Sequence, residues 1–566
     1  MKADLLIKGG TIADGSGGEP FAADIAIVDG RIEAVGASPR WSGAEEIDAR
    51  GLLVTPGFVD IHTHYDGHAT WSDRLEPSSA HGVTTVVMGN CGVGFAPCRP
   101  QDRDRLVRLM EGVEDLPGPV LHEGLPWDWE SFPDYLDRLE AGRFDMDVAA
   151  QVPHAPLRVF VMGERGARRE AATAEDIAAM GRLAREAIEA GAIGFSTSRT
   201  IAHKSSDGEF IPSLTASADE LTGIAREIGK AGRGVIEAIS DFDDLDADFD
   251  LMRAMSRASG RPLSISLMQR EKDPTRWRRV LDRIEAANRD GLAMRGQVCG
   301  RPIGLLLGFH LSTNPFQTCP TWRTALADLP LSDRLAALRQ PETRRMLIEE
   351  AEGADRVRPF EKLYPLVDPV DYEPPASASI AAMAARTGAT ATACAYDMLM
   401  GDDGSGQGIL YAPMSNYADG TLDAALEMLK SPNTVLGLGD GGAHCGLICD
   451  ASFPTWMLTH WGRDRRGERL PIGEIVRALT SDTAEAVAMH DRGRLAAGAK
   501  ADLNLIDMGR LRLRPPAMRW DLPAGGGRLH QKAYGYVATI VSGAITYREG
   551  EATGVLPGRL VRGKRG

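Results

Sequence analysis

Eight short apolar stretches, most of them separated by helical stretches, place the strongest constraint on the fold of this chain. Apolar runs of about four to eight residues are typical of strands that are buried on both faces. Strand–helix alternation predicts a parallel sheet, and eight such units favour closure into a (β/α)₈ TIM-like barrel over one open sheet. The fold class is therefore α/β. The expected strands cover residues 58–64, 83–88, 148–152, 192–196, 234–238, 263–267, 292–298 and 435–440, and helices include 174–190, 217–231, 277–289 and 423–429.

The two ends of the chain have a different sequence pattern from the middle. Residues 1–57 contain short strand patterns with glycine-rich turns, among them an Asp29-Gly30 pair between two apolar runs, which is a hairpin signal. Residues 490–566 also contain short strand patterns with glycine-rich turns. We expect both ends to join in one small β-sandwich domain beside a barrel that spans residues 58–489.

The segment at about 300–375 is too long for an ordinary barrel connection. Long excursions from the active-site side of a barrel are usually lids or substrate loops, so we expect a lid-like insertion here. Its first part, residues 300–309, is apolar for a loop, which hints at an apolar acyl or aryl group on a substrate.

Composition excludes several classes of function. The chain has 566 residues, a formal net charge of −15 and a pI near 5.4, so neither nucleic acid nor an anionic membrane is an expected partner. We find no signal-peptide pattern and no apolar run of membrane-spanning length, and the seven cysteines have no disulfide-framework spacing. We expect a cytoplasmic protein that acts on a small molecule and that could assemble as a homo-oligomer.

Histidines and a carboxylate follow two of the predicted strands. His62 and His64 occupy alternate positions at the end of the first strand, where both side chains can face one point. Asp440 ends the last predicted strand among small residues. The carboxyl ends of barrel strands form the face on which such barrels carry out chemistry. The pattern predicts a metal site.

Several motifs carry a resemblance to a known family. They are Asp60-Ile61-His62-Thr63-His64, Asn90-Cys91-Gly92, residues 111–117, residues 124–130 and residues 521–526. In these motifs the chain resembles the D-aminoacylase (N-acyl-D-amino-acid deacylase) branch of the amidohydrolase superfamily. The match runs nearly end to end, with specific motifs at about residues 50–200 and 430–530.

The resemblance implies a barrel-held Zn²⁺ ion that polarises an amide carbonyl and lowers the pKa of a bound water. It places His62, His64, Asp440 and the family's cysteine, here Cys91, around the metal. Asp440 would be the catalytic residue that takes a proton from the water and passes it to the leaving nitrogen. Fe²⁺, Mn²⁺ or Co²⁺ could occupy the same ligands.

The chain departs from the family at the second metal position. The resemblance places two further histidines on the strands at residues 234–239 and 263–268. Neither stretch contains histidine. The fourth strand, 194–198, offers no lysine that could be carbamylated. We therefore predict one metal ion per chain. Glu237 could replace a lost ligand if its side chain faces inward.

Substrate recognition departs as well. The family is expected to hold the substrate carboxylate with a lysine after the sixth strand and an arginine after the eighth, and that arginine is missing here. Arg270, Arg295 and Arg301 remain as candidates for a carboxylate fork. His154, at the end of the third strand, and His444, four residues after Asp440, are expected to line the substrate site.

The sequence predicts a metal-dependent hydrolase of a linear amide, similar to the N-acyl amino acid deacylases. Hydrolysis of a cyclic amide or another C–N bond is an alternative. A non-catalytic binding protein with a degenerate metal site is a second alternative, which the joint presence of His62, His64 and Asp440 disfavours.

Overall fold

A closed sheet of eight parallel strands forms the centre of the computed structural model, which describes residues 1–36, 41–352 and 358–563. Each strand pairs in parallel with the next. A parallel bridge between Thr63 and Gly441 joins the first strand to the last. This arrangement confirms the predicted barrel. The strands are β6 (Phe58–Asp60), β7 (Val83–Met88), β8 (Asp147–Pro153), β9 (Gly194–Arg199), β10 (Val235–Ser240), β11 (Leu263–Ser266), β12 (Met294–Val298) and β16 (Thr434–Leu436).

The first and last strands of the barrel are shorter than predicted. β6 ends at Asp60 and β16 ends at Leu436, several residues before the expected ligands. Leu438 and Asp440 have φ angles of 60° and 48°, which an extended strand does not allow. His62, His64 and Asp440 therefore lie just beyond the strand ends and do not share a strand face.

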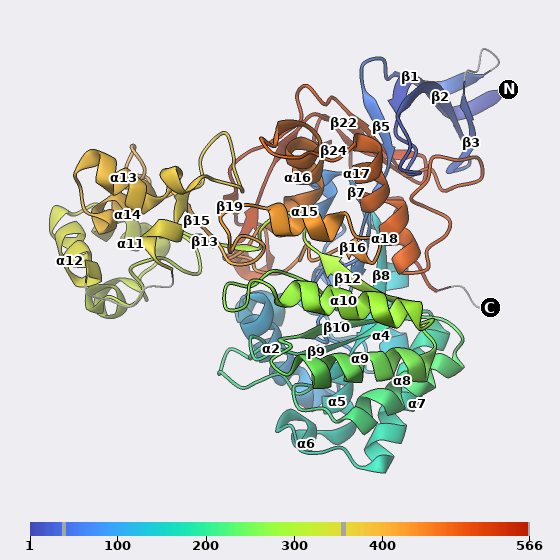
Figure 1. Ribbon diagram of the computed structural model, residues 1–566, viewed down its shortest axis with the longest axis horizontal. Helices are drawn as coiled ribbons and strands as arrows, with labels where there is room; N and C mark the ends of the chain where they lie inside the picture. The colour runs from blue at the N-terminus through green and yellow to red at the C-terminus, as the bar shows by residue number, and fades with distance from the viewer. Residues whose placement is uncertain (37–40, 353–357, 564–566) are drawn as a thin grey trace.

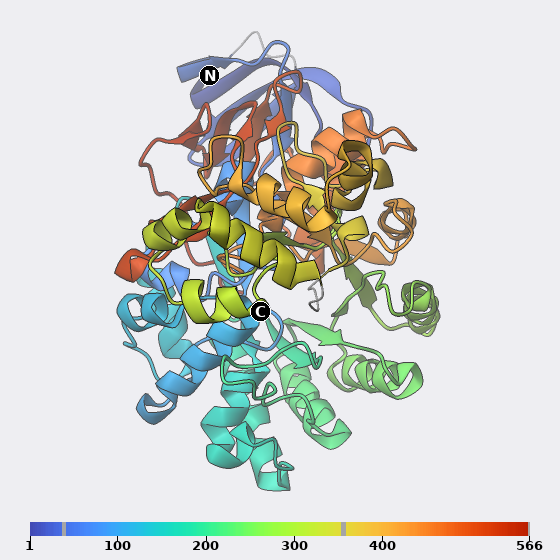
Figure 2. The same cartoon turned by 90° about the vertical axis from the view of Figure 1, so that its left-hand side faces the viewer.

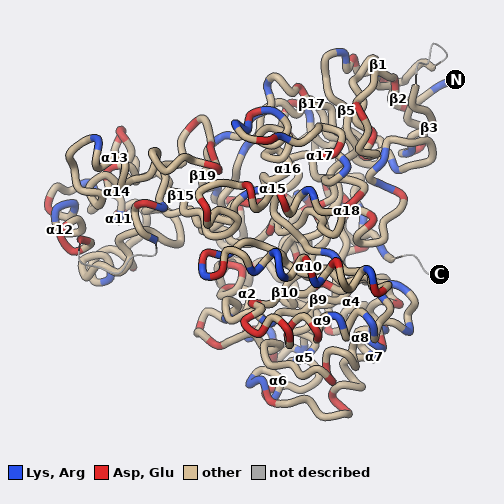
Figure 3. Tube along the Cα trace, in the orientation of Figure 1, with Lys and Arg blue, Asp and Glu red and all other residues tan. Residues whose placement is uncertain are grey.

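Helices cover the outside of the barrel (Figure 1). α7 begins with a capping box between Thr173 and Asp176 and ends before Gly191, whose φ is 124°. Figure 3 shows acidic and basic residues interspersed along α7, α8, α9 and α10. The helices are α2 (Arg103–Glu114), α3 (Gly118–Gly124), α4 (Phe132–Ala141), α5 (His154–Met162), α6 (Glu164–Ala167), α7 (Ala174–Ala190), α8 (Ala218–Lys230), α9 (Leu245–Ser259), α10 (Arg276–Arg289), α15 (Asp423–Leu429), α16 (Phe453–Trp456), α17 (Ile472–Leu479) and α18 (Ser481–Ala486).

The amino-terminal end of the barrel interior is apolar. Val59, Val87, Val235 and Val435 come from four strands and pack together with Met489, which follows α18. A packed layer of this kind closes the barrel to solvent from below. The proposed ligands lie toward the opposite, carboxyl end.

The two ends of the chain meet in a nine-stranded sheet (Figure 1). The joint is an antiparallel pair between β5 and β17, in which Val54 faces Leu505. One buried cluster unites residues from both ends, including Ile25 and Ile540. The strands are β1 (Lys2–Ile12), β2 (Phe21–Val28), β3 (Arg31–Gly36), β4 (Ser42–Asp48), β5 (Leu53–Pro56), β17 (Leu503–Ile506), β22 (Tyr536–Val541), β23 (Ala544–Arg548) and β24 (Glu551–Ala552).

A separate lobe stands beside the barrel, at the left of Figure 1 and toward the viewer in Figure 2. Phe309, Phe316, Trp322 and Tyr396 form the aromatic centre of its own core. The apolar run at 300–309 thus contributes to this core, and Leu307 and Phe309 are not available to a substrate. The lobe continues beyond residue 375. Its elements are β13 (Gly304–Leu307), η3 (Trp322–Leu326), α11 (Leu331–Leu338), α12 (Pro341–Glu352), β14 (Tyr364–Pro365), α13 (Ile380–Thr387), α14 (Ala391–Met400) and β15 (Leu410–Pro413).

Within the described residues, no helix has both the length and the apolarity that crossing a lipid bilayer requires.

Candidate metal centre

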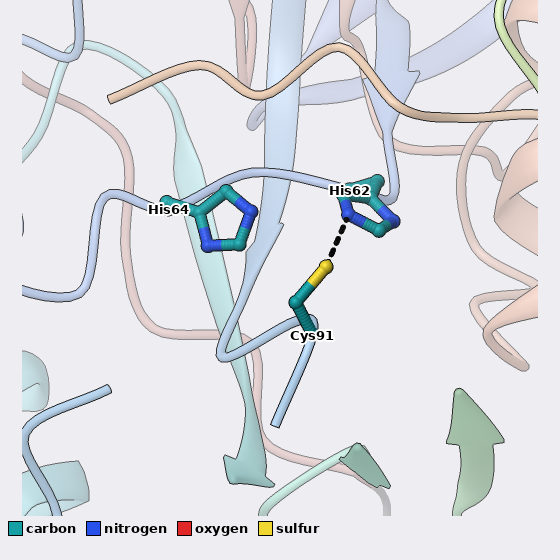
Figure 4. Close-up of side chains that lie close together, drawn as sticks. All are labelled: His62, His64 and Cys91. Carbon is teal, nitrogen blue, oxygen red and sulfur yellow. Dashed lines mark hydrogen bonds between the residues drawn. The ribbon is translucent and has the colours of Figure 1, made fainter. Parts of the chain in front are cut away.

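Two histidines and a cysteine converge at the carboxyl end of the barrel (Figure 4). His62, His64 and Cys91 each offer one donor atom, and the three atoms lie within 4.8 Å of one another. Cys91 Sγ is 3.3 Å from His62 Nε2, and all three side chains are buried. In the part of the chain that the structure describes, no other trio of potential metal ligands converges in this way.

Asp440 adds a carboxylate to this group. Its Oδ1 lies 3.5 Å from His62 Nε2 and 3.7 Å from His64 Nε2. Ligands bound to one tetrahedral zinc ion at about 2.0–2.3 Å are separated from one another by roughly 3.3–3.8 Å. The distances of Cys91 Sγ and Asp440 Oδ1 from His62 Nε2, and of Asp440 Oδ1 from His64 Nε2, fall within this range and are compatible with one metal ion.

Left-handed backbone conformations bring the ligands together. Cys91 has a φ of 55° and Asp440 a φ of 48°, which are uncommon for residues other than glycine. Gly442, with a φ of 90°, passes so close to the chain that a Cβ there would lie 2.9 Å from the carbonyl carbon of His64. Such conformations cost on the order of 1 kcal/mol or more each and persist where the surroundings enforce them, often at functional sites.

An outer hydrogen bond orients the His62 ring. Gln297 Oε1 is 2.8 Å from His62 Nδ1, and the Gln297 amide donates to Ser264 Oγ at 2.8 Å. An acceptor beside Nδ1 keeps the proton there and leaves the Nε2 lone pair free for a metal, an arrangement that is usual around metal-ligating histidines. Glu114 Oε1 lies 3.4 Å from His64 Nδ1, but the two atoms make no hydrogen bond, and His64 Nδ1 is buried without a partner.

Burial and nearby groups hold His64 and Asp440 in the forms that bind metals. Burial lowers the pKa of His64, so its ring is neutral. Burial alone would raise the pKa of Asp440, but contact with His64 and the charge of His62 outweigh it and hold the pKa below its usual range. Burial raises the pKa of the Cys91 thiol well above its usual value, and a divalent cation would reverse this by stabilising the thiolate.

His444 lies beside Glu114 at this centre. Its backbone N–H donates to the Glu114 carbonyl, and its Nε2 is 3.7 Å from Glu114 Oε2. Its Nδ1 is buried without a hydrogen-bond partner. Burial lowers the pKa of His444 to about 4, so the ring is neutral near pH 7. It can offer an N–H to a substrate.

His154 does not have the role predicted for it. Its Nδ1 lies 2.9 Å from Thr197 Oγ1 and its Nε2 lies 3.0 Å from Glu220 Oε1, so both ring nitrogens have partners. The side chain is fully buried, and Arg158 also bonds to Glu220. This histidine holds the start of α5 against β9 and α8, and its ring does not reach a substrate.

Arg295 lies at the wrong end of the barrel for substrate recognition. It stands near the start of β12 and lines a pocket with Pro262, Asn433 and Glu485, which lie at the amino-terminal ends of strands or beside them. The metal centre lies at the opposite, carboxyl end. Strand polarity therefore excludes Arg295 as a carboxylate fork for a substrate at the metal.

Arg301 is buried and already paired. It forms an ion pair with Asp450 and donates to Ser452 Oγ at 2.7 Å. Its guanidinium also lies 3.7 Å from the centre of the Tyr372 ring. With 0% of its side chain exposed, it anchors the loop after β16 and does not present a fork to a ligand.

The sequence pattern of the amidohydrolase family matches residues 45–547. This chain belongs to the amidohydrolase family. It is 37% identical to a D-aminoacylase over 230 residues, which are 40% of this chain and 43% of that protein. It is 34% identical to an N-acyl-D-aspartate deacylase over 296 residues, or 50% of this chain and 54% of the relative. Both relatives come from Alcaligenes xylosoxydans xylosoxydans, and the chain matches about half of their length.

A solved structure supports the fold of this amidohydrolase. The N-acyl-D-glutamate deacylase of Bordetella bronchiseptica, complexed with zinc and a phosphonate inhibitor, has 24% sequence identity and a TM-score of 0.64 over 100% of both chains. At this identity the likeness shows the fold alone. The two curated relatives also confirm the resemblance to the D-aminoacylase branch.

Sequence reasoning missed three residues around this amidohydrolase site. Glu114 lies in the family motif at residues 111–117, which does not indicate its role. Gln297 lies in a predicted strand, where nothing in the sequence distinguishes it. His203 follows β9 and contacts Ser198 Oγ through Nδ1 at 2.9 Å. Burial lowers its pKa to about 3, so the ring is neutral near pH 7. No motif surrounds His203, so only the fold reveals it.

Proposed function

We propose that this amidohydrolase hydrolyses a linear amide of the N-acyl amino acid class, with one divalent metal ion held by His62, His64, Cys91 and Asp440. The observation that carries the proposal is the convergence of these donors, with Gln297 orienting the His62 ring from outside. Nitrogen, thiolate and carboxylate donors together suit Zn²⁺, and Fe²⁺, Mn²⁺ or Co²⁺ are the alternatives.

Bound there, the metal would act as a Lewis acid that polarises the amide carbonyl and lowers the pKa of a water molecule. The side chain of Asp440 is 15% exposed, so a substrate can approach it. Its low pKa keeps it a carboxylate, and we assign it the transfer of a proton, through Oδ2, from water to the leaving nitrogen. The unpaired Nδ1 of His444 is placed to donate a hydrogen bond to the substrate.

The names of the relatives indicate which substrates to test first. D-aminoacylase and N-acyl-D-aspartate deacylase both act on N-acyl-D-amino acids, so the substrate class to expect is an acylated amino acid with a free carboxylate. Arg270 and Arg301 both follow barrel strands at the metal end, but the Arg301 side chain is fully buried and paired with Asp450. The Arg270 side chain is 37% exposed and pairs with Asp241 at 2.7 Å. We assign it the substrate carboxylate.

The direct test is a hydrolysis screen with the metal-loaded protein. It compares N-acyl-D-amino acids, their L-enantiomers, the same amides without the carboxylate, and cyclic amides. We expect turnover of N-acyl amino acids that a chelator abolishes and added Zn²⁺ restores. Replacing Arg270 with Met should raise KM for substrates with a carboxylate and leave it unchanged for those without one.

The matched controls are two double variants. His62→Ala with His64→Ala should lose all turnover, whereas the exposed pair His122→Ala with His490→Ala should retain it. Turnover of cyclic amides alone would replace the linear-amide proposal with the cyclic one. No turnover of any amide by the metal-loaded protein would refute it.

A further inference from the structure

Glu237 is a buried acid on the inner face of the barrel. It lies on β10 two residues after Val235, whose side chain belongs to the apolar layer inside the barrel. Because side chains two positions apart on a strand share a face, Glu237 points into the same interior, one step nearer the carboxyl end. It is only 1% exposed.

The Glu237 carboxylate meets the metal centre at Cys91. Its Oε2 accepts a hydrogen bond from the Cys91 backbone N–H at 2.9 Å. This bond holds the Glu237 carboxylate against the residue whose sulfur is one of the proposed metal ligands.

The second oxygen of Glu237 is unsatisfied. Oε1 is buried and has no hydrogen-bond partner. Removing a carboxylate from water is costly unless hydrogen bonds, an opposite charge or a metal compensates it. Burial raises the pKa of Glu237 to about 7. Oε1 is therefore available to a partner from outside the protein, such as a metal ion.

We propose that Glu237 Oε1 binds the metal ion held by His62, His64, Cys91 and Asp440. The inference rests on the function proposed above and gives the centre a carboxylate ligand from β10, where the family would supply a histidine. The ligand set then has two imidazoles, one thiolate and two carboxylates. This set contains more oxygen than a His–Cys site and favours Zn²⁺, Fe²⁺ or Co²⁺ over a thiophilic cation such as Cu⁺.

The variant Glu237→Gln tests the ligand. Glutamine has the same shape and can still accept a hydrogen bond from the Cys91 backbone N–H, but it lacks the negative charge that favours metal binding. The affinity for Zn²⁺ is measured by competition with a chromophoric chelator, and the Co²⁺-loaded protein gives visible d–d bands that report the ligands. Loss of a residue that only supports a ligand typically lowers metal affinity 10–100-fold. For loss of a ligand we therefore expect the Zn²⁺ affinity to fall at least about tenfold and the Co²⁺ bands to change.

A second measurement separates a ligand from a structural residue. Because Glu237→Gln removes an unpaired buried charge, the Tm of the metal-free protein should stay the same or rise, while the increase in Tm on adding Zn²⁺ should shrink. Asp102→Asn is the matched control, since Asp102 is also a buried acid with one carboxylate oxygen unpartnered, and it lies just before α2, outside the metal centre. It should leave the Zn²⁺ affinity and the Co²⁺ bands unchanged.

The outcomes distinguish this inference from the proposed function. If the unmodified protein binds Zn²⁺ and Glu237→Gln binds it equally well with identical Co²⁺ bands, Glu237 is not a ligand and the hydrolase proposal stands. A lower Tm of the metal-free variant with unchanged affinity would also overturn the inference. If the unmodified protein binds no metal, both proposals fail.

Discussion

Gln297 Oε1 lies 2.8 Å from His62 Nδ1, so a residue on β12 fixes the ring orientation of a histidine that follows β6, 235 residues earlier in the chain. The Gln297 amide is itself fixed by its bond to Ser264 on β11. Three strands thus determine the orientation of one proposed metal ligand.

Replacing Gln297 with Ala should weaken metal binding without removing a ligand. Loss of an outer acceptor of this kind typically costs 10–100-fold in metal affinity or activity, so we expect a change of about that size. Chelator competition measures it. Gln297→Glu keeps an acceptor beside Nδ1 and should retain more of the affinity than Gln297→Ala, and equal affinity of both variants and the unmodified protein would contradict this role.

His444→Ala should reduce catalysis but not metal content. Its unpaired Nδ1 is placed to bond to the substrate, and removing one donor of this kind from an active site costs about 10²–10³-fold in kcat. Steady-state kinetics on the best N-acyl amino acid and metal analysis of the same preparation provide the two readouts. The exposed His490→Ala serves as the control. Unchanged kcat, or loss of metal along with kcat, would contradict the assignment.

The barrel could be predicted because its strands are buried on both faces. The apolar run 83–88 coincides with β7, and α7 was located by its helical periodicity and its ends. The backbone at the metal centre could not be predicted in the same way. Cys91 and Asp440 adopt left-handed conformations that only their tertiary surroundings enforce, and neither is a glycine that would mark the turn.

The roles of charged residues were the least predictable part of the site. Arg301 pairs with Asp450, and Glu373 pairs with Arg465. In both pairs the partner lies far along the chain. Sequence spacing contains no information about such partners, so an arginine in a loop looks available when it is not. His62, His64 and Asp440 were predictable because they follow barrel strands, whose ends must meet.

Arg301→Met should destabilise the fold, because it leaves Asp450 buried without its partner. Breaking a buried ion pair in this way costs about 3–5 kcal/mol, and replacing both partners by apolar residues costs much less. Urea unfolding of Arg301→Met and of the Arg301→Met, Asp450→Leu double variant measures the difference. Arg295→Met is the comparison, and a loss of stability there as large as in Arg301→Met would count against this account.

Glu373 should make stability depend on pH. Burial would raise its pKa, but hydrogen bonds from His460 and Arg465 outweigh it and lower the pKa from 4.5 to about 2. A carboxyl group with a depressed folded-state pKa stabilises the fold above its unfolded pKa and loses this effect as the pH falls through the folded value. For this shift the stabilisation is on the order of 2–3 kcal/mol.

The comparison of Glu373→Gln with the unmodified protein tests this. The difference in free energy of unfolding should be full at pH 6 and should shrink as the pH is lowered toward 2. The exposed Glu361→Gln, in the same lobe, should show little difference at either pH. A penalty for Glu373→Gln that is equal at pH 6 and pH 3 would show that the effect is not ionic.

Metal content per chain tests the central claim most directly. Plasma mass spectrometry is applied to protein purified without added metal or chelator, beside the His62→Ala, His64→Ala double variant and the His122→Ala, His490→Ala control. We predict about one tightly held divalent transition metal ion per chain in the unmodified protein and the control, and none in the His62, His64 variant. Absence of metal from the unmodified protein, even after reconstitution with Zn²⁺, would contradict the account.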